Sequence, residues 1–338
     1  MLKAAITGVR KAELVQAEMP RARDNWVVVR TTIIPMCTEY KAFTAGIQTA
    51  FLGHEAVGVV EEVAQPGRVA VGDHVVVMPL FPCGVCDLCV AGDYIHCEHG
   101  VNPAVSTGSP EGAATYAEYV VKQDWLLPRI PDDVSDELAG LALCALGPTM
   151  GALERMQVDA FDTVLITGTG PVGLGGVVNA SYRGARVLVA EGIPWRADKA
   201  RELGAAQVFD PADPEIAAQI RQATGWVGVD AALDCSGTVA AERLCIDAVR
   251  RRGQVAYVGE CDQPLEVRIS PDMIRKGISI HGSWHYNLNL YPKIVQVLRN
   301  APNAAKLISH ILPFAEVQKA LEICASHECA KVLLRAGV

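Results

Sequence analysis

The sequence has no run of basic residues and no apolar run long enough to cross a membrane. It carries 30 Lys and Arg against 38 Asp and Glu, a net charge of −8. Nucleic-acid affinity depends mainly on Lys and Arg at phosphates, so a nucleic-acid partner is not expected. No stretch approaches about 18 uninterrupted apolar residues, so no membrane partner is expected either. Internal repeats and low-complexity segments are also missing from the sequence.

The N-terminal residues lack the apolar core of a signal peptide, because they lead directly into strand-like sequence. The chain has 11 cysteines, an odd number, which fits metal thiolates in a reducing compartment better than a disulfide framework. We therefore expect a cytoplasmic protein. With 338 residues, half of them hydrophobic and a fifth charged, the chain can form two domains with a sizeable core.

The first third of the chain consists of short β-rich runs broken by Gly and Pro. Strand-like sequence covers 26–30, 56–63, 74–78 and 113–121, and Val71-Gly72-Asp73 has the composition of a turn. This pattern predicts a Gly-rich, barrel-like β-domain.

Strands and helices alternate after about residue 135. Expected strands are 163–167, 186–190, 208–210, 229–234, 254–258 and 278–280; expected helices are 136–144, 148–155, 171–183 and 197–203. Such alternation is typical of a doubly wound parallel sheet. The C-terminal part adds expected helices around 291–299 and 315–325 and a final strand at 330–334.

Four cysteines lie within fifteen residues, with the spacing C-x2-C-x2-C-x7-C at Cys83, Cys86, Cys89 and Cys97. Four thiolates from one short segment can close a tetrahedral zinc site. The alternatives are a disulfide cluster and an iron–sulfur site, although the latter uses different spacings. We predict a zinc-binding lobe at about residues 80–100.

A glycine-rich motif follows the expected strand 163–167 and begins a helix. It contains Gly168, Gly170, Pro171, Val172 and Gly173. The glycines permit a tight turn and the close approach of a pyrophosphate, which the N–H groups of the helix N-terminus then bind. This context indicates a dinucleotide site rather than a plain structural turn.

Two charged residues after the second strand of this region bear on the choice of dinucleotide. The carboxylate of Glu191 can accept hydrogen bonds from ribose hydroxyls and would repel the 2′-phosphate of NADP. This favours NAD. Arg196, five residues further on, could instead accommodate a 2′-phosphate, or be a solvated residue at the start of a helix.

Cys37, His54 and Cys144 form a second candidate set of metal ligands. Two thiolates and an imidazole are a known ligand set of catalytic zinc with an open fourth position. Their spacing alone does not establish a metal site, because a single His and two distant Cys are more often core residues.

Taken together, these motifs resemble the zinc-dependent medium-chain alcohol and polyol dehydrogenases over nearly the whole chain. The resemblance rests on Cys37, Gly53-His54-Glu55 with Gly58, Val71-Gly72-Asp73, the cysteines of 83–97, Leu143-Cys144-Ala145, the motif 168–173, Asp234-Cys235-Ser236-Gly237 and Val258-Gly259-Glu260. It implies an α/β protein with a GroES-like Gly-rich barrel as catalytic domain, residues 1–147 and 283–338, and a Rossmann NAD-binding domain at 148–282.

The resemblance also implies two zinc ions per chain. A structural zinc would lie in the four-cysteine lobe. A catalytic zinc would be held by Cys37, His54 and, as third ligand, Cys144, with Glu55 beside it as an alternate ligand. The family's zinc acts as a Lewis acid on a substrate hydroxyl, while hydride passes to the nicotinamide. Family members are usually oligomers, so we expect a homotetramer or a homodimer.

Further residues enter the cofactor site through the same resemblance. Cys235, Val258, Gly259 and Ser283 correspond to loops of the nucleotide domain. The stretch around Ser283 lies near the nicotinamide in this family, so Trp284 or Tyr286 could line the substrate pocket, although packing aromatics are an equal alternative.

The sequence departs from the family just after Cys37. The family usually has Ser or Thr two places after this Cys, then often Asp, and often His at the fifth place; here these are Glu39, Tyr40 and Ala42. Glu39 could be a general base, bind a second hydroxyl or an ammonium of the substrate, or point outward. Counted with Glu55, it would make the pocket acidic, which suits polyols and amino alcohols such as aminocyclitols.

These inferences predict an NAD-dependent oxidoreductase that acts on a secondary alcohol or the matching ketone, a polyol, sugar or amino alcohol being the expected substrate. Two alternatives remain. Cys144 as third ligand would also suit a simple primary-alcohol dehydrogenase. A structural or binding relative without turnover is the other alternative, against which the intact ligand set and glycine motif argue.

Overall fold

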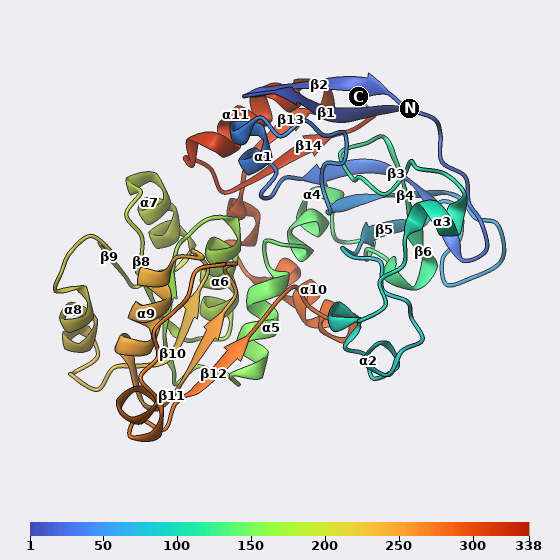
Figure 1. The fold of residues 1–338 in the computed structure, drawn as a ribbon. Helices are drawn as coiled ribbons and strands as arrows, with labels where there is room; N and C mark the ends of the chain where they lie inside the picture. Colours follow the sequence, from blue (N-terminus) through green and yellow to red (C-terminus); the bar gives the residue numbers. More distant parts are fainter. Residues whose placement is uncertain (338) are drawn as a thin grey trace. The chain divides into compact units, whose positions relative to one another are not determined.

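The computed structural model describes residues 1–337, which divide into two compact units (Figure 1). The first unit comprises 1–143, 287–299 and the residues from Ile308 onward, and the second comprises 144–286 and 300–307. The unit boundaries thus fall at 143/144 and 286/287, close to the expected 147/148 and 282/283.

Segment 300–307 differs from expectation, because it groups with the nucleotide-binding unit rather than with the β-rich one. The reason is local packing. The 3-10 helix η6 (Ala304–Leu307) buries Ala304 and Leu307 against the helices α6 and α7, and Lys306 forms an ion pair of 3.6 Å with Glu202.

The first unit is built around a six-stranded sheet in the order β13-β14-β3-β4-β5, with β6 also paired to β3. Its strands are β3 (Trp26–Pro35), β4 (Ala56–Glu62), β5 (His74–Val77), β6 (Tyr119–Gln123), β13 (Ile308–Pro313) and β14 (Lys331–Arg335). The long central strand β3 pairs antiparallel with β6 at its start and with β14 at its end. Its Val and Ile side chains are buried on both faces, which explains the continuous apolar sequence.

Shorter elements surround this sheet. A hairpin of β1 (Leu2–Gly8) and β2 (Lys11–Gln16) precedes it, and the helices are α1 (Tyr40–Ala45), α2 (Asp87–Val90), α3 (Pro103–Thr107), α4 (Asp136–Ala139), α10 (Tyr291–Asn300) and α11 (Val317–Ser326). Single 3-10 turns are η1 (Tyr94–His96), η2 (Asp124–Leu126), η3 (Gly140–Ala142), η5 (Leu288–Leu290) and η7 (Phe314–Glu316). Helix α11 packs against α1 and β2, and the core between them includes Phe43, Tyr116 and Leu321.

Two expected elements of this unit have different limits. The expected strand 113–121 is a strand only from Tyr119, and the residues before it form a buried loop. The expected helix 136–144 begins as predicted, with Ser135 accepting a hydrogen bond from the N–H of Leu138. It tightens to a 3-10 turn at Gly140, where a Cβ would lie 3.1 Å from Pro35.

The second unit contains a six-stranded, all-parallel sheet in the order β12-β11-β10-β7-β8-β9. The strands are β7 (Thr163–Thr167), β8 (Arg186–Ala190), β9 (Gln207–Phe209), β10 (Val229–Asp234), β11 (Val249–Tyr257) and β12 (Ser279–Gly282). The helices are α5 (Gly147–Arg155), α6 (Pro171–Tyr182), α7 (Pro194–Leu203), α8 (Ile216–Ala223) and α9 (Val239–Ala248), followed by the π-helical turn η4 (Ile269–Ile274). The strand order reverses between β7 and β10, as in a Rossmann fold, which confirms the predicted fold class.

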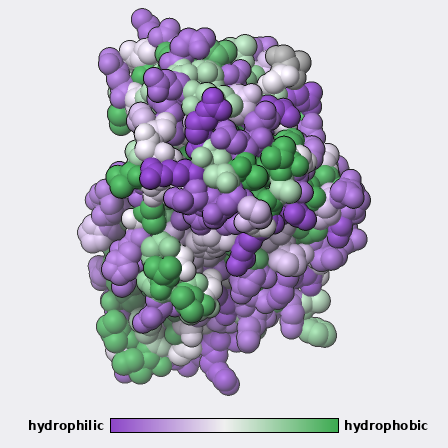
Figure 2. Space-filling model, turned by 90° about the vertical axis from the view of Figure 1, so that its right-hand side faces the viewer, coloured by the Kyte–Doolittle hydropathy of each residue, from purple (hydrophilic) through white to green (hydrophobic). Residues whose placement is uncertain are grey.

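Within residues 1–337, no helix has both the length and the apolar character needed to span a membrane. The face drawn in Figure 2 is largely hydrophilic, with hydrophobic side chains in separate patches.

Candidate metal and cofactor sites

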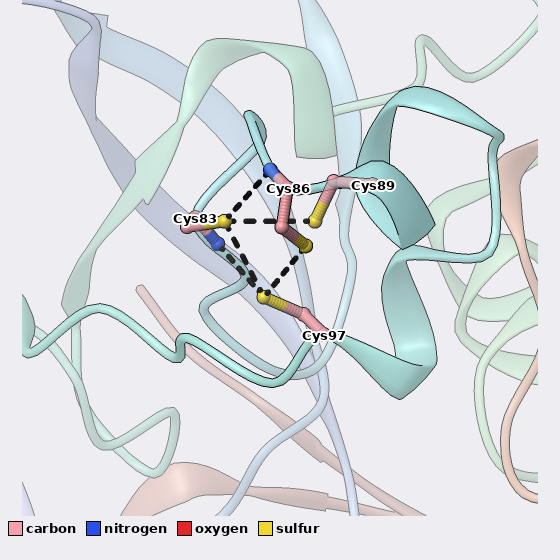
Figure 3. A group of neighbouring side chains, drawn as sticks. All are labelled: Cys83, Cys86, Cys89 and Cys97. Atoms are coloured by element: carbon pink, nitrogen blue, oxygen red, sulfur yellow. Dashed lines mark hydrogen bonds between the residues drawn. The ribbon is translucent and has the colours of Figure 1, made fainter.

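The four cysteines of the lobe converge on one point (Figure 3). The Sγ atoms of Cys83 and Cys89 lie 3.9 Å apart, those of Cys86 and Cys97 3.9 Å, and those of Cys83 and Cys97 3.6 Å. Four sulfurs at tetrahedral corners about 2.3 Å from a zinc ion lie about 3.8 Å apart. The side chains therefore have the spacing that a zinc ion needs.

Backbone amides point at the sulfurs of this lobe. The N–H groups of Val85 and Cys86 donate to Cys83 Sγ at 3.5 and 3.3 Å, and that of His99 donates to Cys97 Sγ at 3.4 Å. The amides of Val85 and Cys86 lower the pKa of Cys83 to about 6, whereas burial raises the pKa of Cys89 to about 12. A bound dication would favour the thiolate form of all four groups.

The second set of predicted ligands also comes together. Cys37 follows β3, His54 and Glu55 precede β4, and Cys144 follows η3, bonded directly to Leu143 of the first unit. One ligand atom from each of these four side chains lies within 4.8 Å of the others. Two sulfurs, an imidazole and a carboxylate suit zinc. The residues present therefore fit the metal that the sequence predicts.

Glu39 faces inward and is bound on both oxygens. Its Oε1 lies 3.0 Å from Nδ1 of His54, and its Oε2 accepts hydrogen bonds from the N–H of Cys37 at 3.0 Å and the hydroxyl of Tyr116 at 2.9 Å. The reading in which Glu39 points outward is therefore wrong. The sequence had not indicated the contact with His54, because the Asp of the family pattern stands one position later in the chain.

The electrostatics of this pair favour a cation on the imidazole. Burial raises the pKa of Glu39, but the hydrogen bond and charge of His54 outweigh it and hold that pKa at about 2. Burial lowers the pKa of His54, but hydrogen bonds with Cys37 and Glu39 raise it to about 11. A metal ion bound by His54 would take the place of this proton, and Glu39 would then fix the ring tautomer through Nδ1.

Glu55 is paired with a residue that the sequence analysis missed. Its Oε1 lies 2.7 Å from Nζ of Lys331, and both side chains are fully buried. Burial nevertheless raises the pKa of Glu55 to about 7, against the opposing charge of Lys331. The sequence signal was available, since Lys331 is a charged residue that directly precedes three apolar residues of the strand. The sequence analysis counted both Glu39 and Glu55 as acidic charges of the pocket. Because Lys331 neutralises the charge of Glu55, the pocket is less acidic than expected.

The glycine motif has the geometry of a phosphate-binding turn between β7 and α6. Gly168 has φ +76°, and a Cβ there would lie 2.6 Å from Ser236. A Cβ on Gly173 would lie 1.9 Å from the carbonyl oxygen of Gly168. Gly170 is the N-cap and Pro171 starts the helix, so the following N–H groups, beginning with Val172, are free of intrahelical partners.

Glu191 holds the same turn in place. Its Oε2 accepts from the N–H and the hydroxyl of Thr169 at 2.7 and 2.8 Å, and its Oε1 accepts from the N–H of Ile193 at 2.9 Å. Arg196 reaches the turn from α7, because its Nη1 lies 4.0 Å from the point where a Cβ of Gly170 would be. Both predicted selectivity residues therefore lie at the glycine motif.

The other predicted cofactor residues follow the carboxyl ends of neighbouring strands. Cys235 follows β10, Val258 and Gly259 follow β11, and Ser283 follows β12. The N–H groups of Val258 and Gly259 both donate to the carbonyl of Asp234, at 2.9 and 3.0 Å. Ligands of doubly wound sheets bind at this edge. The sequence predictions for the second unit thus gather at one end of its sheet.

The aromatic candidates differ in exposure. Tyr286 is 2 % exposed, whereas Trp284 is 40 % exposed with its ring 4.8 Å from that of His285. Outside the two sets of candidate ligands, Cys245, Cys324 and Cys329 are buried, and Cys235 and Cys261 are half-buried.

Comparison with known proteins agrees with this arrangement. Residues 23–132 match the alcohol dehydrogenase GroES-like domain, and residues 171–300 match the zinc-binding dehydrogenase family. A sorbitol dehydrogenase of Halalkalibacterium halodurans is 31% identical, with 84% of this chain and 82% of the relative covered. An L-threonine 3-dehydrogenase of Anaeromyxobacter sp. is also 31% identical, over 85% of this chain and 82% of the relative. The solved alcohol dehydrogenase TADH from Thermus sp. ATN1 matches with a TM-score of 0.89 at 25% identity, covering 99% of each chain.

A GroES-like unit joined to a Rossmann unit defines a nicotinamide-dependent dehydrogenase. The chain belongs to the zinc-dependent medium-chain alcohol and polyol dehydrogenase family. It is therefore an oxidoreductase that acts on alcohol groups, as the sequence predicted.

Proposed function

We propose that the protein oxidises a secondary alcohol of a polyol, sugar or amino alcohol with NAD, or reduces the matching ketone, using two zinc ions per chain. The observation that carries the proposal is the convergence of Cys37, His54, Glu55 and Cys144 within 4.8 Å. In this proposal Cys37, His54 and Cys144 hold the catalytic zinc. The structural zinc is held by Cys83, Cys86, Cys89 and Cys97.

Zinc in the first set supplies Lewis acidity to the substrate oxygen, and NAD accepts the hydride. The residues of the chain orient and balance this chemistry. Glu39 accepts the Nδ1 proton of His54 and so directs Nε2 towards the metal. Lys331 compensates the charge of Glu55, so this carboxylate can lie beside the site without leaving an isolated buried charge. Glu39 is a positioning residue in this scheme, since its three contacts leave it little capacity to accept a substrate proton.

Two features support NAD over NADP. The carboxylate of Glu191 stands at the end of β8, where a 2′-phosphate would meet its charge. Arg196 lies over Gly170, so its charge can compensate the pyrophosphate without a 2′-phosphate. Replacing Glu191 with Ala should narrow the preference for NAD, measured as the ratio of kcat/KM for the two cofactors.

The substrate class is supported by the relatives rather than by charge. The similar proteins include sorbitol dehydrogenases and L-threonine 3-dehydrogenases, whose names specify substrates with several polar groups. A simple primary-alcohol dehydrogenase is the second candidate, favoured by Cys144 as the third ligand beside Cys37 and His54.

A substrate panel tests the proposal. NADH formation would be followed with diols, polyols, amino alcohols and ethanol, in parallel with NADP, on protein whose zinc content is measured. We expect two zinc ions per chain and higher kcat/KM with NAD and a diol or polyol than with ethanol. Higher kcat/KM with ethanol would favour the second candidate, and no turnover with any alcohol would contradict both.

The proposal further includes a cytoplasmic homotetramer or homodimer. Light scattering on purified protein measures the subunit number, and a monomer would contradict this part. Fluorescent tagging in the native cell would test the compartment.

A further inference from the structure

A cavity of about 60 Å³ lies within the first unit, beside His54. Its walls come from the segment Met78–Phe81 after β5, from Gly112–Thr115 and from the start of β6. Space of about 10–15 Å³ on this measure holds one water molecule. The cavity is therefore large enough for several waters or for a small polar group of a ligand.

Thr115 lines this cavity, and its hydroxyl has no partner among the described residues. Thr115 is 5 % exposed, and its Oγ1 is buried without a hydrogen bond. Buried hydroxyls are nearly always paired in native proteins, so an unpaired one at a cavity wall points to a partner supplied from outside the chain.

Lys122 lines the same cavity and is 2 % exposed. Its Nζ donates to the carbonyl of Leu80 and lies 3.8 Å from the ring centroid of Phe81. Among the described residues no carboxylate forms an ion pair with Lys122, and burial holds its pKa well below the usual range. The amino group carries more N–H groups than its bond to Leu80 uses, so Lys122 can donate a further hydrogen bond.

We propose that Thr115 and Lys122 form a subsite for a second hydroxyl group of the substrate. His54 is part of the same cavity wall, so the subsite lies next to the proposed catalytic metal. Lys122 donates a hydrogen bond to the substrate hydroxyl, and this hydroxyl donates to Oγ1 of Thr115. The inference rests on the proposed function and extends it, because it names residues that distinguish a diol from a simple alcohol.

Two alcohols that differ by one hydroxyl, 2,3-butanediol and 2-butanol, test the subsite in the zinc-loaded enzyme with NAD. Thr115→Val keeps the side-chain shape and should lower kcat/KM for the diol about tenfold, mainly through KM, the size expected for one lost hydrogen bond. The value for 2-butanol should stay within about twofold. Thr31→Val is the matched control, since Thr31 is 1 % exposed and donates to Ala117 rather than facing the cavity.

If Thr115→Val lowers kcat/KM equally for both alcohols, or for neither, the subsite is overturned while the proposed function stands. Lys122→Met is the second variant, and it should also lower kcat/KM for the diol but not for 2-butanol. If it instead lowers kcat/KM only for 3-hydroxybutyrate, the subsite binds a carboxylate and the proposal is wrong.

A binding measurement separates the subsite from turnover. The Tm of the zinc-loaded protein should rise more with the diol than with 2-butanol, and Thr115→Val should remove this difference. If the wild-type enzyme turns over neither alcohol, the full substrate panel decides the proposed function, and the difference in Tm between the two alcohols decides the subsite. If the Tm of the wild-type protein rises equally with the diol and with 2-butanol, the subsite is overturned.

Discussion

The two candidate metal sites use similar donor atoms but are assembled in opposite ways. The lobe takes all its sulfurs from residues 83–97, and the backbone amides that donate to them come from residues 85–99. The Cys37 site draws on three distant segments and depends on buried partners as remote as Lys331. A contiguous site can be recognised from the spacing of its ligands, whereas the ligands of a dispersed site become neighbours only in the folded chain. Substitutions should therefore distinguish the two sites, by loss of activity at the Cys37 site and loss of stability at the lobe.

Loss of a ligand in the dispersed site should have the largest effect on activity. Cys37→Ala removes a thiolate from the proposed catalytic zinc, and we expect kcat/KM to fall by about a thousandfold or more, since Lewis-acid catalysis contributes several kcal/mol. Metal analysis should show one zinc per chain remaining in the lobe. Retention of both zinc ions and of full activity would contradict the assignment.

Loss of a ligand in the lobe should damage stability instead. Cys97→Ala should lose the other zinc and lower Tm markedly, because structural zinc binding contributes directly to folding and each kcal/mol shifts Tm by about 2–4 °C at this size. The protein that remains folded should keep its kcat. A selective loss of kcat with an unchanged Tm would reverse the roles of the two sites.

Breaking the buried ion pair should show how far the dispersed site depends on its surroundings. Lys331→Met leaves Glu55 buried without its partner, and we expect a loss of about 3–5 kcal/mol in the free energy of unfolding, measured by urea denaturation. The double variant Lys331→Met with Glu55→Gln is the control and should recover part of this loss. A single variant as stable as the wild type would show that the pair contributes little.

The smallest effect is expected at Glu39. Glu39→Gln should lower the zinc affinity of the Cys37 site or kcat/KM by about 10–100-fold, as is typical when a hydrogen-bond partner of a ligating His is replaced. The loss should be equal for diols and simple alcohols, because Glu39 acts through His54. Tyr116→Phe, which removes one contact to Glu39, should have a smaller effect. A loss confined to diols would instead make Glu39 a substrate-binding residue.

The fold was predictable where the pattern is local. The alternation after residue 135 and the motif 168–173 correctly predicted the parallel sheet. The sequence analysis did not anticipate the β1–β2 hairpin, α1, α8, α9 or β13. Several of these are short elements, whose limits depend on packing more than on propensity.

The surroundings of the candidate site were less predictable than its ligands. Cys37, His54 and Cys144 were named through family resemblance, but Tyr116 and Lys331 were not. Their hydrogen bonds join residues 77 and 276 positions apart, and no local pattern encodes such a pairing. A Lys directly beside a run of apolar strand residues is the available signal, and it applies to both Lys122 and Lys331.

The pairing of Glu55 with Lys331 has a consequence for the order of synthesis. The second unit is nearly continuous, so most of it is available to fold once residue 286 has left the ribosome. The first unit cannot complete its fold before β14 is synthesised, because β3 pairs with β14 and Glu55 forms its ion pair with Lys331 of that strand. Until then, Glu55 of a nascent chain has no counter-charge from Lys331. Metal loading of the Cys37 site is therefore expected to be a late, post-translational event, whereas the lobe can bind zinc as soon as Cys97 emerges.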